Sequence, residues 1–282
     1  ILMTMNLKQE TIKRAVSAFL GTAFISALAA IAINNDIILP LGNYFSFIEL
    51  AFHNSAFIKY NYHNVILAFA TTLSFYLLIE RKSRYTYWLL LFILVYAISI
   101  FTERGRAGQV IFNLSAGFYI FYYNRENLLW LCGFLVLLLS FQAVIYNSTN
   151  VYKHRFDAVS NIILNNGDRR EGKIKDIRYV FVKETLSRIL EKPILGYGTG
   201  SFGAIFDAEV KTGHNFINHK TPHNQYLYVW FELGIIGLVL LILIFYHQLK
   251  ELFRKKDGIH RVLLPLSFMF LMLVDSYFFI FI

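Results

Sequence analysis

The chain has 282 residues, of which 56% are hydrophobic, 17% are aromatic and only 16% are charged. A soluble domain carries about 25% charged residues, so this composition excludes an ordinary soluble globular protein. The formal net charge of +9 is explained by basic residues at the ends of membrane helices rather than by nucleic-acid binding. The single cysteine, Cys132, lies within an apolar run, which excludes a disulfide framework.

Several apolar segments approach the length of about 20 residues that a helix needs to cross the hydrocarbon core of a membrane. They lack the alternation of polar and apolar residues that a membrane β-strand shows. We therefore predict an all-α fold, a polytopic transmembrane helical bundle with a periplasmic loop domain. In chain order, membrane helices are expected near Ala15–Ile33, His63–Ile79, Thr86–Phe101, Ala107–Tyr123, Asn127–Tyr146, Gln225–Tyr246 and Val262–Ile282.

The basic residues between these segments predict the orientation of the chain, because lysine and arginine beside membrane helices prefer the cytoplasmic side. If the predicted helices simply alternate, all the basic clusters fall on one side of the membrane, which is then the cytoplasm. The loop between Asn147 and Thr221 then lies outside. The clusters consist of Lys8, Lys13 and Arg14; Arg81, Lys82 and Arg84; Arg125; and Lys250, Arg254, Lys255, Lys256 and Arg261.

This orientation divides the chain into three parts: N-terminal transmembrane helices (1–146), a periplasmic loop with an amphipathic helix (147–221) and C-terminal transmembrane helices (222–282). The apolar segment Ile37–Phe52 contains a proline, a glycine and a glutamate. We expect it to be interfacial or re-entrant on the outer side, because a further span would invert everything upstream of it. The chain begins on Ile1 and stops inside an apolar run, so flanking helices are expected to be missing, at the N-terminus in particular.

The outer loop contains a predicted helix and a glycine-rich turn. Between Lys173 and Lys192, apolar residues recur at broadly helical spacing with basic residues between them, which predicts a basic amphipathic helix able to rest on a membrane surface. Pro193 ends this helix, and Gly196, Gly198 and Gly200 follow at every second position. Such a backbone can turn tightly and cradle an anion with successive amides. It is not a P-loop, since no Gly-Lys-Ser/Thr follows, and a simple turn after a helix is the alternative.

The segment Thr221-Pro222-His223-Asn224 opens the next predicted membrane helix. Thr221 is a good N-cap and Pro222 suits the first helical position, so we expect His223 in the first turn. The positive end of the helix dipole there disfavours imidazolium and keeps the ring neutral. A neutral histidine beside spare backbone amides can act as a general base next to a bound anion. The alternative is a solvated histidine at a helix end.

A spacing motif adds to this interpretation. His223-Asn224, nine residues, Gly234, two residues and Gly237 fit the pattern His-[Asn/Ser/Gln]-x9-Gly-x-x-Gly. This pattern resembles the bacterial O-antigen ligase family, which also includes O-antigen polymerases and protein O-oligosaccharyltransferases. The resemblance extends in the expected order over about residues 101–246. Its other segments are Thr102–Gly108, which resembles an arginine motif at an outer helix end, and Glu191–Gly200 and Phe231–Leu238, which flank the histidine.

The resemblance implies a multi-pass enzyme of the bacterial inner (cytoplasmic) membrane that catalyses metal-independent, inverting glycosyl transfer on the periplasmic face. The implied donor is a glycan on undecaprenyl pyrophosphate, and the implied acceptor is a hydroxyl, most simply that of the lipid A-core oligosaccharide. No cofactor is implied. The developing charge on the leaving pyrophosphate must be stabilised by a metal or by fixed cations, and no metal-ligand cluster stands out in the loop. Arginines are therefore the natural candidates, since they bind phosphate bidentately.

The candidate catalytic residue is His223, as general base. Arg106 and Arg178 match the two family arginines and are expected to hold the pyrophosphate; Gly105 points to Arg106 rather than to Arg104, because the family motif has Ser or Gly just before the arginine. The alternative for Arg106 is that its side chain snorkels to the membrane surface. The alternative for Arg178 is that it is one basic residue among several on a lipid-facing helix. Further candidates for substrate binding are Arg104, Asn224, Gly198 and Gly200, and Arg188, Arg169 and Arg170 remain open as alternatives.

Three other residues receive weaker interpretations. His63 and His214 repeat the His-Asn dipeptide without the glycine spacing, and we interpret His63 as acceptor-site lining and His214 as a loop residue. Glu232 is expected to point into the bundle and bond a neighbour as a structural residue. O-antigen polymerase and protein O-oligosaccharyltransferase are the alternatives within the family. A transporter or flippase of lipid-linked glycan is the alternative of another class, opposed by the lack of an inverted repeat and by the gathering of ionisable residues at the outer face.

Overall fold

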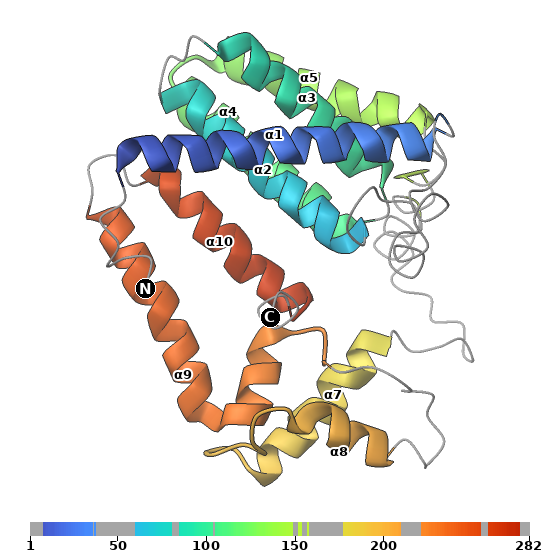
Figure 1. Ribbon diagram of the computed structural model, residues 1–282, viewed down its shortest axis with the longest axis vertical. Helices are drawn as coiled ribbons and strands as arrows, with labels where there is room; N and C mark the ends of the chain where they lie inside the picture. The colour runs from blue at the N-terminus through green and yellow to red at the C-terminus, as the bar shows by residue number, and fades with distance from the viewer. Residues whose placement is uncertain are drawn as a thin grey trace. The chain divides into compact units, whose positions relative to one another are not determined.

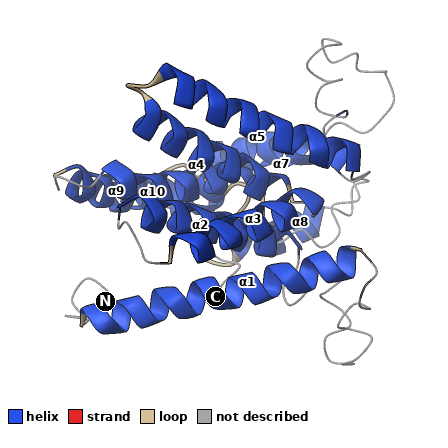
Figure 2. Ribbon diagram, turned by 90° about the horizontal axis from the view of Figure 1, so that it is seen from above, coloured by secondary structure: helices blue, strands red, loops and turns tan. Residues whose placement is uncertain are grey.

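The computed structural model describes residues 8–35, 37, 60–80, 85–103, 105–148, 152–153, 157, 177–209, 221–254 and 259–276. Within these ranges every regular element is an α-helix, as Figures 1 and 2 show, which agrees with the predicted all-α class. The chain separates into two compact units, Ile1–Asp168 and Arg169–Ile282.

The first unit contains helices α1 (Gln9–Asn34), α2 (Tyr60–Glu80), α3 (Thr86–Thr102), α4 (Arg106–Asn124) and α5 (Leu128–Ser148). Helix α2 packs against α1, α3 and α4, and α5 packs against α3 and α4. Small residues line these contacts: Ala27, Ala30, Ala68 and Ala70 are fully buried. Small side chains let helix backbones approach closely, which is how helices associate where lipid replaces water.

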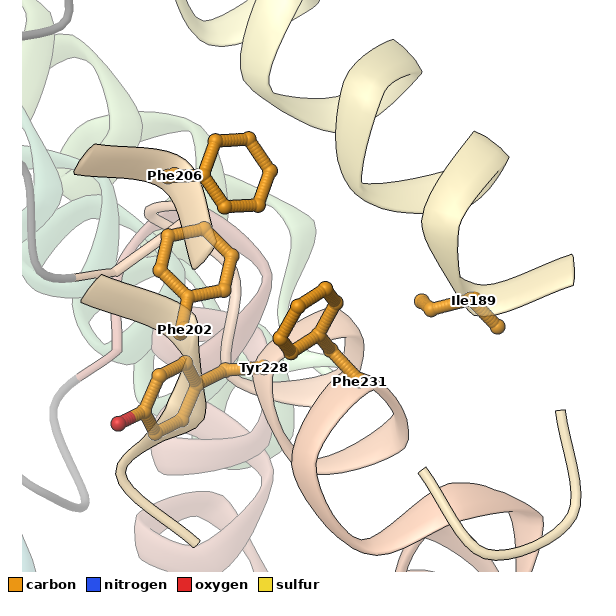
Figure 3. Close-up of a cluster of buried hydrophobic side chains, with 5 residues drawn as sticks. All are labelled: Ile189, Phe202, Phe206, Tyr228 and Phe231. Atoms are coloured by element: carbon orange, nitrogen blue, oxygen red, sulfur yellow. The ribbon is translucent and has the colours of Figure 1, made fainter. Parts of the chain in front are cut away.

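The second unit contains helices α7 (Ile177–Glu191), α8 (Ser201–Glu209), α9 (Gln225–Phe253) and α10 (Ile259–Val274). Helix α9 packs against all three of the others. A buried cluster of largely aromatic side chains joins α7 and α8 to α9, and Figure 3 shows its rings gathered together, with Phe202 and Phe206 stacked at a centroid distance of 4.3 Å. The members of the cluster are Ile189, Phe202, Phe206, Tyr228 and Phe231.

Helices α1, α5 and α9 are long and apolar enough to cross a membrane, and α3 and residues Arg261–Val274 of α10 are shorter apolar helices. On α5 the apolar side chains point outward: Leu129 is 86% exposed, and Ile145 is the one buried residue of this helix. An outward apolar surface of this kind is stable against lipid and costly in water. The chain is therefore a multi-pass membrane protein, although its orientation across the membrane stays a prediction.

Every predicted membrane segment corresponds to a helix, with shifted bounds. Helix α7 ends at Glu191, just before Pro193, as the sequence predicts, while residues 173–176 lie outside the described residues. The last predicted helix, Val262–Ile282, is wrong at its end, because α10 stops at Val274 and Asp275 follows in a bend. The interfacial segment predicted after Ile37 also lies outside the described residues, as do residues 210–220.

Candidate functional site

Helix α9 is broken, contrary to the predicted continuous membrane helix. Gly234 has φ 66° and ψ −170°, which interrupts the helical backbone, and the helix bends sharply in Figure 1. At the break, the carbonyls of Phe231 and Glu232 accept hydrogen bonds from the amides of Tyr197 and Gly198, each at 2.9 Å. The Ile235 amide donates to the Pro193 carbonyl, also at 2.9 Å. The segment 193–198 therefore satisfies backbone groups that an intact helix would satisfy internally.

Two glycines are required where these segments meet. Gly196 and Gly234 have φ values of 70° and 66°, a region that side-chain-bearing residues rarely adopt. A Cβ on Gly196 would also lie 2.6 Å from the Glu232 carbonyl group, and a Cβ on Gly234 would overlap the backbone of Ile194. The first glycine of Gly-x-x-Gly thus marks the break in α9. At the second, Gly237, a Cβ would overlap the side chain of Leu233 on the preceding turn.

The anion held by the glycine-rich turn belongs to the protein itself. Glu232 is 2% exposed, and its Oε1 accepts from the amides of Gly200 at 3.0 Å and Phe202 at 3.4 Å. The carboxylate thereby stabilises the positive N-terminal end of α8. The structural role predicted for Glu232 is confirmed. The amides of Gly198 and Gly200 both donate within the chain, and the binding of a ligand anion by these two residues stays a prediction.

His223 lies three positions earlier relative to the start of α9 than the sequence predicts, because the helix is capped three residues later. The N-cap is Asn224, not Thr221: its side-chain oxygen accepts from the Leu227 amide at 3.1 Å. Asparagine is a stronger N-cap than threonine, which accounts for the shift. His223 therefore precedes the cap rather than sitting in the first turn. It adopts φ 53°, the one non-glycine residue with positive φ in the part of the chain that the structure describes.

The His223 ring is oriented by a carboxylate. Its Nδ1 lies 3.0 Å from Asp275 Oδ1, and the exposed fractions of the two side chains are 29% and 12%. An ionised carboxylate only accepts hydrogen bonds, so Nδ1 carries the proton and donates it. In a neutral ring of this tautomer, Nε2 is the basic nitrogen. A histidine held in this way by an acid can take a proton from a substrate and be stabilised as imidazolium while it holds it.

Asp275 is a site residue that the sequence reasoning missed. It is the single charged residue of the predicted segment Val262–Ile282, and an acid in such a segment is costly unless it is paired, which was the available signal. Because α10 ends at Val274, Asp275 emerges at the helix end and also accepts from the Ser276 amide at 2.8 Å. Two further contacts tie this end of α10 to the start of α9, from Asn224 Nδ2 to the Leu273 carbonyl at 3.3 Å and from the Tyr226 hydroxyl to the Met269 carbonyl at 3.1 Å.

The predicted arginines are distributed over both compact units. Arg106 is the first residue of α4, in the first unit, and its side chain is exposed. Arg178 is the second residue of α7, in the second unit, and its side chain lies outside the described residues, as Arg104 does entirely. Arg188 Nη1 pairs with Glu191 Oε1 on the same helix at 3.2 Å. Arg169, Arg170 and His214 also lie outside the described residues.

His63 lies in the interior of the first unit, and its interpretation as acceptor-site lining stays a prediction. His63 is 1% exposed and is held by two buried side chains, Ser26 Oγ at 2.8 Å from Nε2 and Glu103 Oε1 at 2.7 Å from Nδ1. Its polar atoms therefore serve contacts within the first unit. As for metals, no group of three His, Cys, Asp or Glu side chains within the described ranges is placed to hold an ion.

These features describe a multi-pass helical membrane protein with a histidine, oriented by a carboxylate, at the start of a broken helix. The O-antigen ligase family model matches residues 89–242, more than half of the 282 residues. The chain belongs to the O-antigen ligase family, which confirms the resemblance found in its motifs. The matched range includes Arg106, Arg178 and His223 but ends before Asp275.

Two relatives are similar to parts of the chain. A Rickettsia conorii protein named "Putative polysaccharide ligase RC0486" is 40% identical over 73 residues, which are 23% of this chain and 17% of that protein. An uncharacterized protein of Haemophilus influenzae is 21% identical over 187 residues, which are 64% of this chain and 46% of that protein. The chain thus spans less than half the length of each of these relatives.

Proposed function

We propose that this protein is a periplasm-facing glycosyltransferase of the inner membrane, which moves a glycan from undecaprenyl pyrophosphate to a hydroxyl of the lipid A-core oligosaccharide. The transfer inverts the anomeric carbon and needs no metal. The observation that carries the proposal is the His223–Asp275 contact of 3.0 Å, in a chain of the O-antigen ligase family. A His–carboxylate pair suits the removal of a proton from an attacking hydroxyl.

The reaction needs one proton to be taken up and one leaving group to depart. As the acceptor oxygen attacks the anomeric carbon, its proton passes to His223 Nε2 and Asp275 stabilises the resulting imidazolium. The bond from the anomeric carbon to the pyrophosphate oxygen breaks on the opposite face, which inverts the centre. Undecaprenyl pyrophosphate leaves with the bonding electrons, and the proton on His223 returns to solvent or to the released diphosphate.

The arginines have a separate role in this proposal. Arg106 and Arg178 bind the donor pyrophosphate and stabilise the charge that grows on it, with Arg104 as a further contact. Arginine suits this task because its planar fork binds phosphate oxygens in pairs and stays charged. Asn224 acts through His223 instead: both polar groups of its side chain are used within the chain, where they hold the start of α9.

The test is transfer by the purified protein in detergent or proteoliposomes, supplied with undecaprenyl-pyrophosphate glycan and a panel of acceptors in EDTA. We expect a glycosylated lipid A-core product of inverted configuration. A product formed only on a second lipid-linked glycan, or only on a protein, would assign the same chemistry to a polymerase or a protein O-oligosaccharyltransferase. Activity that EDTA abolishes and Mg²⁺ or Mn²⁺ restores would contradict metal independence. Movement of labelled donor across the membrane without covalent transfer would replace the proposal with transport.

A further inference from the structure

A buried polar network lies next to Arg106 in the first compact unit. His63 of α2 contacts Ser26 of α1 through Nε2 and Glu103 through Nδ1, at 2.8 Å and 2.7 Å. Glu103 follows the last residue of α3, and its Oε1 also accepts from the Ser99 hydroxyl at 3.0 Å. The side chains of His63 and Glu103 are 2% and 0% exposed. Ionisable groups buried in a membrane protein are costly and point to a function.

The neighbouring residue, Asn64, packs against the same turn. Its Nδ2 donates to the carbonyl of Ile100, near the end of α3, at 3.0 Å. Gly105, the N-cap of α4, approaches so closely that a Cβ there would lie 2.7 Å from Asn64 Cβ. A Cβ on Gly108 would overlap the side chain and backbone of Asn64. The His63-Asn64 dipeptide thus holds both sides of the turn that presents Arg106.

We propose that His63 and Asn64 are positioning residues, which fix the backbone at Glu103 and from Gly105 to Gly108 so that the exposed Arg106 side chain is held in one direction toward the donor pyrophosphate. This inference rests on the proposed function, in which Arg106 binds the donor. Bidentate binding demands a fixed guanidinium plane, and supporting residues provide such fixed directions. Apart from the contact of His63 with Ser26 of α1, the contacts of both residues fall at the end of α3 and the start of α4, on either side of Arg106.

The chain offers a matched control on the same pair of helices. Thr72 of α2 contacts Ser115 of α4 through their hydroxyl oxygens at 2.7 Å, and both side chains are buried. This contact joins α2 to α4 away from Arg106. Thr72→Val therefore removes a buried bond between the two helices without touching the turn, whereas Asn64→Ala removes the bond and the packing at the turn itself.

The first measurement reports how firmly the side chain at position 106 is held, and it requires no glycan donor. A nitroxide is attached at Arg106→Cys in a Cys132→Ser background, and its mobility is measured by electron paramagnetic resonance. We expect a restrained label that Asn64→Ala mobilises and Thr72→Val does not. Gly105→Ala, which forces Asn64 aside, should mobilise it as well and replaces Asn64→Ala if that variant folds poorly. An unchanged spectrum in these variants, or equal mobilisation by Thr72→Val, overturns the proposal.

The second measurement uses the intact Arg106 and the transfer assay. Asn64→Ala should raise KM for the undecaprenyl-pyrophosphate donor by about 10-fold to 100-fold with kcat little changed, and should have no further effect once Arg106 is replaced by Ala. Thr72→Val should leave this KM unchanged. A mobilised label with an unchanged donor KM would keep the positioning role and remove pyrophosphate binding from Arg106. Additive losses in the Asn64→Ala/Arg106→Ala double variant would overturn positioning.

Discussion

At the scale of single residues, His223 combines a strained backbone with an oriented ring. A non-glycine residue at φ 53° costs on the order of 1–3 kcal/mol and persists only where the surroundings determine it. Here Asp275 holds the ring and the Asn224 cap starts the helix directly after it. Strain of this kind gathers at functional sites, which agrees with the role proposed for His223.

His223→Ala should nearly abolish transfer, a loss of about 10²–10⁴ in rate, while donor binding stays intact because the arginines remain. Rates and donor binding are measured separately on the purified protein. If His223→Gln kept a near-normal kcat with a weakened KM, the histidine would only bind substrate and the base assignment would be wrong.

Asp275→Asn tests the orienting partner. The amide keeps the shape of the side chain but no longer demands a proton on Nδ1 and cannot stabilise imidazolium, so kcat should fall by about 10²–10⁴ with donor KM little changed. Ser276→Ala is the matched control, because Asp275 binds the Ser276 backbone amide and not its side chain. Equal losses in both variants would indicate disruption of the end of α10 rather than loss of orientation.

Arginine geometry gives a third residue-scale prediction. Arg106→Lys and Arg178→Lys should each impair transfer severely although the charge is kept, because lysine cannot form the bidentate contact. Arg104→Lys should be milder, and Arg188→Lys on the same helix as Arg178 serves as a control, since Arg188 pairs with Glu191. The steady-state rates of the four variants are compared at saturating donor. An inactive Arg104→Lys beside a near-normal Arg106→Lys would reverse the assignment.

At the scale of elements, the break in α9 organises the second unit. The segment 193–198 enters the break and supplies backbone partners on both sides of it, and the Trp230 indole also donates to the Pro193 carbonyl at 3.1 Å. Glu232, two residues before Gly234, caps α8. One broken helix therefore places α7, α8 and the His223 segment around its short N-terminal half.

Gly234→Ala should be strongly destabilising for this reason. The new Cβ would have to avoid the Ile194 backbone, and the residue would have to hold a positive φ, which together cost on the order of 1–3 kcal/mol or more. Gly203→Ala within α8 is the control, because a Cβ there meets nothing within 4 Å and alanine favours a helix by up to about 1 kcal/mol. Thermal unfolding in detergent measures both. A Gly234→Ala variant as stable as wild type would show that the break is not required.

At the scale of the whole molecule, the basic residues between the helices predict the orientation of the chain across the membrane. We expect residues 147–221 to face the periplasm. Lys192→Cys, at an exposed position in this loop, should label with an impermeant maleimide in intact spheroplasts in a Cys132→Ser background. Lys255→Cys should label only after the membrane is permeabilised. Protection of position 192 together with labelling of position 255 from outside would invert the orientation.

The sequence alone is enough to predict the helices, because a membrane helix satisfies its backbone internally and its existence depends only on a local run of apolar residues. It also pointed to His223 and to the glycines at 234 and 237, since their spacing lies within one segment. The hydrogen-bond partners of these side chains depend on the tertiary structure. Asp275 lies 52 residues from His223, Glu103 lies 40 from His63, and the amides that Glu232 binds lie 30 and 32 residues before it. Hydropathy and spacing carry no information about which distant groups meet, because that depends on how the helices pack.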